Sequence, residues 1–312
     1  VLEQAENQNE GQNKEQAQLQ LQKLNQILVS IVKHEWTTTW TNFLSEICQT
    51  AYQSEAKCQN ILKILQIISE EVFDFGKQNI VSEKHQEYKQ IIYKEVNSLM
   101  ELCNYVIMSA TNQQNQISEQ LIRQCLKTFT VFISWLPNGY VFENDLIEVI
   151  LRNFIFPSIT RLDSIKLFTE VVQIDLEDEE ESLKSSYKER KIMLFCIFIE
   201  NIQAVTKGRD LREEYQTLKQ KRQTSGFETF CEQLCQAISA VLLENLSSIE
   251  KITNTMEQNP NIESLKNFTR LALNYMIQCS NISDDELFKI CLNFWHNWTK
   301  DLVQIVNPHF FQ

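Results

Sequence analysis

Apolar residues recur at helical spacing along most of this chain, beginning with residues 24–47. The i, i+3, i+4, i+7, i+8 spacing of a helix with one buried face is followed by Leu24, Ile27, Leu28, Ile31 and Val32. Three threonines at positions 37–39 then interrupt the pattern, which resumes at Trp40. Because threonine is a poor residue inside a helix but a good cap, we expect a helix, a tight corner and a second helix that threonine hydroxyls cap.

The predicted corner is flanked by Trp36 and Trp40. Their indole rings are large enough to seal the wedge between two helices that meet at a corner. Neither of these helices could bury its apolar face alone. We therefore expect further helix pairs to stack on this one.

Similar patterns predict helices throughout the rest of the chain. Ser54 is expected to cap a helix that runs to about residue 75, and Pro137 to end another. The basic stretch 207–222 is interpreted as a solvated connecting helix. Residues 1–14 are mostly Gln, Asn and Glu, and we expect them to be poorly ordered or frayed. The remaining predicted helices span about residues 81–108, 121–136, 144–155, 158–173, 183–205, 226–250, 262–279 and 284–306.

Composition supports an all-helical fold and limits the classes of partner that the chain is expected to bind. Only five glycines and four prolines occur in 312 residues, so few turns that demand positive φ can form. The net charge of −12 argues against direct binding of nucleic acid. The longest strongly apolar run, residues 192–199, is too short for a bilayer, which needs about 20 residues. We therefore expect no membrane and no nucleic-acid partner.

The nine cysteines lie within apolar helical patterns. An odd number of thiols embedded in cores is typical of a reduced protein of the cytosol or nucleus. Cys231 and Cys235 are one helical turn apart, but no histidine or second cysteine pair has ligand spacing around them. We expect neither a metal site nor a cofactor.

Motifs of catalysis are incomplete in this sequence. His34 and Glu35 begin like a zinc-protease H-E-x-x-H motif, but Thr38 stands where the second histidine is required. The other histidines, His85, His296 and His309, are scattered along the chain. General acid–base chemistry therefore lacks a plausible constellation, and we expect no catalytic residues and no enzyme.

Several blocks of sequence resemble a known family. The segment Ile-Val-Lys-His-Glu-Trp at 31–36, followed by Trp-Thr-Asn-Phe-Leu at 40–44, resembles the karyopherins of the importin-β superfamily, in which Trp-containing turns join HEAT repeats. Residues 58–75, 132–143 and 286–295 resemble the nuclear export receptors of that family. The resemblance begins at about residue 24 and weakens between about residues 174 and 226. The family usually has prolines in the first turn, where this chain has Thr37 and Thr39.

The resemblance implies a fold and a set of structural residues. It implies an all-α, right-handed α-solenoid of HEAT-like antiparallel helix pairs, with about five to six repeats over residues 15–312. It also implies that four tryptophans pack between repeats, namely Trp36, Trp40, Trp135 and Trp295.

The function implied is that of a nuclear export receptor that shuttles between nucleus and cytoplasm. Its partners would be Ran-GTP, cargo with a leucine-rich export signal, and FG nucleoporins, whose Phe side chains would enter between neighbouring first helices. Early repeats of the family contact Ran, and the export-signal groove lies in later repeats, outside this chain. The candidate Ran-binding residues form one polar stripe, Gln59, Lys63, Glu70 and Asp74. The same stripe could equally be a solvated helix face.

Two other interpretations remain open. Another HEAT scaffold, such as a phosphatase regulatory subunit, would have more regular repeats and a different partner. A helical enzyme would have a deep polar pocket with converging histidines and carboxylates.

Overall fold

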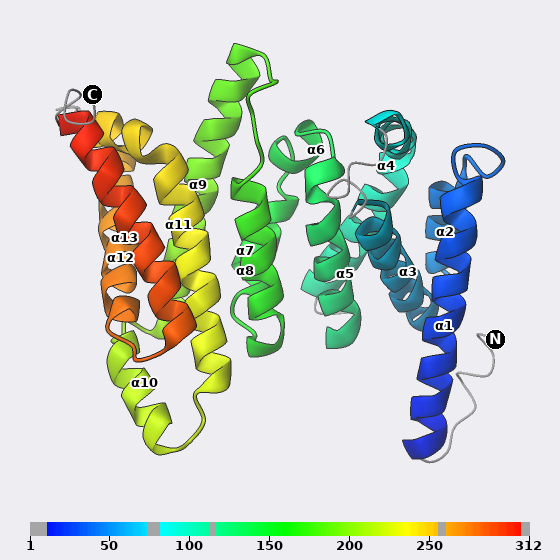
Figure 1. The fold of residues 1–312 in the computed structure, drawn as a ribbon, viewed down its shortest axis with the longest axis horizontal. Coiled ribbons are helices and arrows are strands. Elements are labelled where there is room, and N and C mark those ends of the chain that lie inside the picture. Colours follow the sequence, from blue (N-terminus) through cyan, green and yellow to red (C-terminus); the bar gives the residue numbers. More distant parts are fainter. Residues whose placement is uncertain (1–10, 74–81, 113–116, 255–259, 307–312) are drawn as a thin grey trace. The chain divides into compact units, whose positions relative to one another are not determined.

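The computed structural model describes residues 11–73, 82–112, 117–254 and 260–306, and every regular element in these ranges is helical. Consecutive helices run back and forth and pack in pairs (Figure 1). The predicted all-α fold is confirmed. Of the segment 1–14, residues 1–10 lie outside the described ranges, and the first helix begins at Gly11. No helix in the described ranges is both long and apolar enough to cross a membrane.

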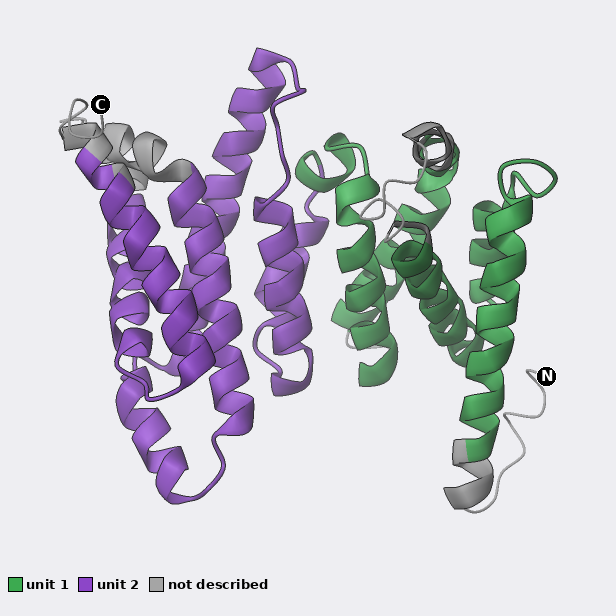
Figure 2. Cartoon of the chain, viewed as in Figure 1, with its two compact units in different colours: residues 1–143 green, residues 144–312 purple. Residues whose placement is uncertain are grey.

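The chain divides into two compact units, residues 1–143 and 144–312 (Figure 2). In the first unit, α3 packs between α1 and α5, and α2 packs against α4. These contacts form two helix layers, one of α1, α3 and α5 and the other of α2 and α4. The helices of this unit are α1 (Gly11–Glu35), α2 (Phe43–Ala51), α3 (Glu55–Phe73), α4 (Ser82–Thr111), α5 (Glu119–Phe132), the 3-10 turn η3 (Ile133–Trp135) and α6 (Gly139–Phe142).

In the second unit, α7, α9 and α12 form one layer, and α8, α11 and α13 form the other. Each of these helices packs against the other helix of its own pair or against a helix of the next pair. This is the packing of an α-solenoid. The predicted connecting helix is present as α10 and packs against α12. The helices of this unit are α7 (Leu146–Phe154), α8 (Ser158–Val172), α9 (Glu181–Thr206), α10 (Leu211–Gln220), α11 (Ser225–Asn254), α12 (Pro260–Ser280) and α13 (Asp285–Val306).

The first corner forms where predicted, but the expected threonine cap is wrong. The backbone N–H groups of Thr38, Thr39 and Trp40 all donate to the carbonyl of Glu35, the last residue of α1. The Thr38 hydroxyl donates to the same carbonyl, and the Thr39 hydroxyl donates to the Glu35 carboxylate. The threonines therefore close the end of α1 rather than begin α2.

The beginning of α2 is capped from another helix. The side chain of Asn42, which precedes α2, makes no capping hydrogen bond. Instead, the carboxylate of Glu95 on α4 accepts the Leu44 N–H at 2.9 Å and the Ser45 hydroxyl at 3.3 Å. Glu95 thus satisfies a helix-end donor that would otherwise be buried without a partner. Ser54 does cap α3 as predicted, because its hydroxyl accepts the Lys57 N–H at 3.3 Å.

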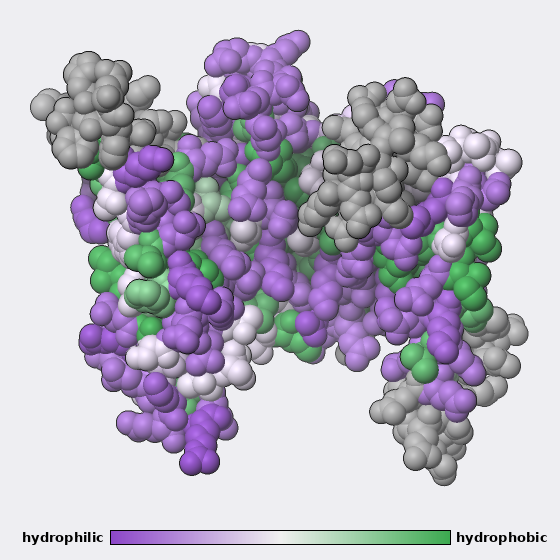
Figure 3. Space-filling model, viewed as in Figure 1, coloured by the Kyte–Doolittle hydropathy of each residue, from purple (hydrophilic) through white to green (hydrophobic). Residues whose placement is uncertain are grey.

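The buried face of α1 also differs from the predicted one. Leu24, Ile27 and Ile31 are exposed, whereas the buried residues are Asn25, Val29, Val32 and Trp36. The buried set includes Asn25 because its side-chain amide donates to Oδ1 of Asn60 on α3 at 2.8 Å. A hydropathy pattern counts Asn25 as polar and so misplaces the centre of the buried face, although Val32 is buried as predicted. Figure 3 shows hydrophobic patches exposed among mainly hydrophilic side chains.

Candidate partner-binding surfaces

The predicted Ran-binding stripe lies along one face of α3. Lys63 and Glu70 are exposed, and Gln59 is half-buried. The fourth residue, Asp74, lies outside the described residues. The three described side chains are placed by the helical repeat, which brings residues three or four positions apart onto the same face.

Hydrogen bonds connect this face of α3 to α5. Gln66 donates to Glu70 at 2.7 Å, and Gln124 on α5 donates to Oε1 of Gln66 at 2.8 Å. The fully buried Thr128 then donates to the Leu62 carbonyl on α3 at 2.8 Å. Glu70 therefore projects from a surface whose side chains are held in place by amide and hydroxyl contacts. The sequence signal was weak, because Gln124 and Thr128 look like ordinary surface residues.

The same layer is joined to α1 by polar contacts. Lys33 on α1 forms an ion pair with Glu71 on α3, with Nζ and Oε2 2.9 Å apart. Asn25 and Asn60 donate to each other's side-chain oxygens at 2.8 and 3.3 Å. Both contacts fix how α1 lies on α3, and so they position the polar face that a partner would meet.

The four tryptophans occupy different surroundings. Trp36 is completely buried, while Trp40 is half-buried, stacks edge-on against Phe43 with ring centroids 4.8 Å apart, and donates to Glu46 at 2.9 Å. Trp135 is buried in η3. Trp295 is half-buried in the middle of α13, where its Nε1–H donates to Ser280, the last residue of α12, at 2.9 Å.

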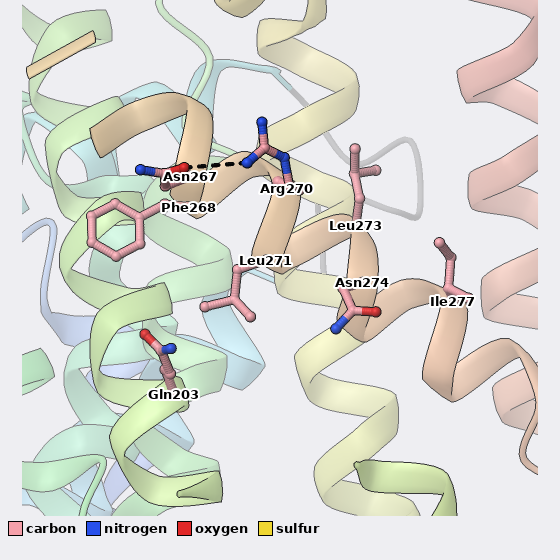
Figure 4. Close-up of a pocket in the computed structure, with 8 residues that line it drawn as sticks. All are labelled: Gln203, Asn267, Phe268, Arg270, Leu271, Leu273, Asn274 and Ile277. Atoms are coloured by element: carbon pink, nitrogen blue, oxygen red, sulfur yellow. Dashed lines mark hydrogen bonds between the residues drawn. The ribbon is translucent and has the colours of Figure 1, made fainter. Parts of the chain in front are cut away.

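A hollow of about 580 Å³ lies over α9 and α12 in the second unit (Figure 4). The apolar part of its lining comes from four side chains of α12, Phe268, Leu271, Leu273 and Ile277. The polar part comes from Gln203 on α9 and from Asn267, Arg270 and Asn274 on α12. Arg270 donates to Asn267 at 3.4 Å, which leaves part of its guanidinium facing the hollow.

Sequence reasoning named no residue of this hollow. Ile277 has half of its surface (51%) exposed, although its apolar character suggested ordinary core. The hollow depends on the distance between two helices that are 54 or more residues apart in sequence. No local pattern in the sequence predicts the distance between α9 and α12.

The titratable groups in the described part of the chain include no cluster of metal ligands. No group of three or more His, Cys, Asp or Glu side chains there is placed to hold a metal ion. His34 on α1 and His296 on α13 are both exposed. Burial raises the pKa of Cys58 to about 12 and also raises the pKa of Glu170. Loss of contact with water disfavours the charged form of an acid and so raises its pKa.

Stacked antiparallel helix pairs, with polar contacts between neighbouring helices, define an α-helical repeat protein. Residues 18–173 match the family of Exportin 1-like proteins, and residues 269–303 match the chromosome region maintenance or exportin repeat. The chain belongs to the exportin 1-like family. The resemblance predicted from the sequence is therefore confirmed.

Curated relatives extend this similarity over nearly the whole chain. The chain is 33% identical to Protein EXPORTIN 1A of Arabidopsis thaliana over 286 residues, which cover 91% of this chain and 24% of that protein. It is 28% identical to Exportin-1 of Drosophila melanogaster over 302 residues, covering 95% of this chain and 25% of that protein. Exportin-1 of Schizosaccharomyces pombe is 27% identical over 286 residues. The chain thus spans about a quarter of the length of these relatives.

Proposed function

We propose that this chain forms part of a nuclear export receptor that shuttles between nucleus and cytoplasm. The receptor binds Ran-GTP and carries cargo with a leucine-rich export signal through the nuclear pore. The observation that carries the proposal is the similarity to exportin-1 relatives over 91–95% of the chain, in a fold of stacked helix pairs. The receptor works by coupled binding and not by catalysis, since Ran-GTP and cargo each favour the same conformation and so each raise the other's affinity.

The proposed contact with Ran-GTP is the polar face of α3, with Gln59, Lys63, Glu70 and Asp74. Its support is that Lys63 and Glu70 are exposed two turns apart on the same face of a helix that packs between α1 and α5. A surface of mixed charge with fixed side chains contributes more to the choice of partner than to raw affinity.

A nucleotide-dependent pull-down tests this contact. The chain is immobilised and incubated with Ran loaded with GTP or with GDP, and we expect more Ran to be retained in the GTP form. The double charge reversal E70K/D74K should reduce that retention several-fold. The control is E101K, which reverses one charge on the exposed side of α4, in the other helix layer, and is matched by the single reversal E70K. Equal retention of the two nucleotide forms, or equal losses in both variants, would reject the α3 surface.

The hollow over α9 and α12 is the proposed site for a Phe side chain of an FG nucleoporin. These two helices are first members of neighbouring pairs, and the hollow combines four apolar side chains with amides that can bond a peptide backbone. Chemical-shift changes on titration with an FG-repeat peptide should map to α12. The exposed substitution Ile277→Asp should abolish them, whereas Ile27→Asp, at an equally exposed apolar position on α1, should not. Shift changes that survive Ile277→Asp would place the peptide elsewhere.

The cargo signal is proposed to bind outside this chain. We expect a fluorescently labelled leucine-rich export peptide to show no saturable change in anisotropy with the 312-residue chain. Saturable binding at micromolar concentration would contradict this and would locate a cargo groove within these helices.

A further inference from the structure

Four buried thiols come together in the second unit, from three helices that are distant in sequence. Cys231 and Cys235 lie on α11, Cys279 on α12 and Cys291 on α13, and none is more than 1% exposed. The Sγ atoms of Cys235 and Cys291 are 3.9 Å apart, which is van der Waals contact between two sulfurs. The neighbouring thiols of Cys231 and Cys235 lower the pKa of Cys279, so all four cysteines interact in one row.

The geometry favours thiol chemistry over a metal site. The described residues contain no group of three or more ligands placed around one point, so these four sulfurs do not converge as a zinc site requires. A disulfide needs only two sulfurs, and a modest change of side-chain rotamers brings a contact of 3.9 Å to bonding distance. All nine cysteines are free thiols in this structure.

We propose that Cys235 and Cys291 are a redox-active pair that forms a disulfide between α11 and α13 when the protein meets hydrogen peroxide. The Cys291 sulfur attacks one peroxide oxygen, giving a sulfenic acid and one water. The Cys235 sulfur then attacks the sulfenic sulfur, forms the S–S bond and releases a second water. Two thiols lose two electrons and two protons, and one peroxide is reduced to two waters.

Cys291 is the better first nucleophile of the two. The contact with the Cys235 thiol lowers the pKa of Cys291, burial opposes this, and the neighbouring Ser280 hydroxyl lowers the pKa further. The pKa of Cys235 is raised by its hydrogen bonds to Cys279 and Cys291 and by burial. Cys291 also adjoins the half-buried Ser280, whereas Cys235 is completely buried. The thiolate is the reactive form, and Cys291 therefore reacts first.

Peptide mapping under oxidising conditions tests the proposal. The reduced chain is treated with a small excess of hydrogen peroxide, unfolded in N-ethylmaleimide to block free thiols, and digested without reduction by trypsin and a Glu-specific protease. The second protease is needed because only Glu232 separates Cys231 from Cys235, whereas trypsin already separates Cys279 from Cys291 at Lys289. Mass spectrometry should find the Cys235 and Cys291 peptides joined, two hydrogens lighter than their sum and separable by dithiothreitol.

Variants provide the matched comparison. Cys291→Ser and Cys235→Ser should each abolish the joined peptide, whereas Cys196→Ser, at the only half-exposed cysteine, should leave it unchanged. The oxidised chain should also melt several degrees higher, since the bond closes a loop between residues 56 positions apart. Peroxide treatment that modifies Cys196 while Cys235 and Cys291 stay free for maleimide would overturn the proposal. Peptide mapping of the unmutated chain shows whether the Cys235–Cys291 disulfide forms, even if a serine variant does not fold.

Discussion

The ammonium of Lys191 lies 2.8 Å from a carboxylate oxygen of Glu244, and the lysine side chain is completely buried. The same ammonium donates to the Ile174 carbonyl at 2.7 Å, just beyond the end of α8. One cation therefore connects α9, α11 and the segment after α8. A buried charge is tolerated only when it is paired and hydrogen-bonded, so this contact fixes how three parts of the second unit lie together.

The two sides of this ion pair should respond unequally to mutation. Glu244→Ala leaves a fully buried ammonium with only a carbonyl partner and should cost about 3–5 kcal/mol of unfolding free energy. Lys191→Met keeps an apolar chain of similar length, and the partly exposed Glu244 returns to water. The remaining loss, an unpaired Ile174 carbonyl, should cost about 1–3 kcal/mol.

Urea denaturation of the purified chain measures both changes. Glu200→Ala is the control, because that carboxylate is exposed and its loss should change stability by less than about 0.5 kcal/mol. Equal costs for Glu244→Ala and Lys191→Met would mean that the buried charge is not the source of the effect.

The Asn25–Asn60 amide pair should behave as a coupled unit. Asn25 is buried, so Asn25→Ala leaves the Asn60 side chain facing a gap without its partner, at an expected cost of about 1–3 kcal/mol. Replacing both residues by leucine removes both polar groups together and should cost less than the two single Leu changes combined. A double-mutant cycle on unfolding free energies gives the coupling. Additive single and double effects would show that the two amides do not depend on each other.

Glu95 should make stability depend on pH in a particular direction. Burial raises its pKa above the usual value of 4.5, and hydrogen bonds from Leu44 and Ser45 offset only part of that rise. The folded state then holds its proton to higher pH than the unfolded state. Glu95 therefore stabilises the fold most below about pH 4.5, and this contribution falls as pH rises through the folded pKa.

Comparison with Glu95→Gln isolates this effect, because glutamine keeps an acceptor for the Leu44 N–H but does not titrate. The difference in unfolding free energy, unmutated minus variant, should decrease as pH rises from about 4 to about 8. A difference that increases over this range would indicate that the carboxylate is stabilised in its charged form.

The tryptophans of the first corner should differ in importance. Trp36 is completely buried, so Trp36→Ala leaves a large cavity and should cost about 3–5 kcal/mol. Trp40 is half-buried and holds its place through Phe43 and Glu46, so Trp40→Ala should cost about 1–2 kcal/mol. Thermal and urea unfolding would measure both. A larger loss of unfolding free energy from Trp40→Ala than from Trp36→Ala would show that the Trp40 ring, and not the Trp36 ring, fills the corner.

The positions of most helices could be predicted from the sequence, since they depend on local spacing. The predicted helix of 158–173 is observed as Ser158–Val172, and that of 284–306 as Asp285–Val306. Some helix caps could also be predicted from neighbouring residues, as the cap of α3 by Ser54 shows. The cap of α2 was not, because its acceptor, Glu95, stands 51 residues further along the chain.

The candidate surfaces also divide into those that local sequence predicts and those that depend on contacts between distant helices. The stripe of Lys63 and Glu70 follows from the repeat of a single helix and was predictable. The hollow over α9 and α12 and the contact of Cys235 with Cys291 each require two or more helices to meet. The first buried face was misread because Asn25 is polar in isolation and becomes a core residue only when Asn60 lies opposite it.

The sequence by itself determined that this protein is helical, roughly where its helices begin and end, and which family it resembles. These properties depend on residues within one or two turns of each other and on short blocks of recognisable residues. Only the tertiary structure decided which side of α1 is buried, which distant group caps α2 and which thiols touch. Those outcomes depend on pairing free energies between groups more than 30 residues apart, as for Asn25 with Asn60 and Lys191 with Glu244. A polar or charged side chain becomes stable in a core only when its partner arrives with it.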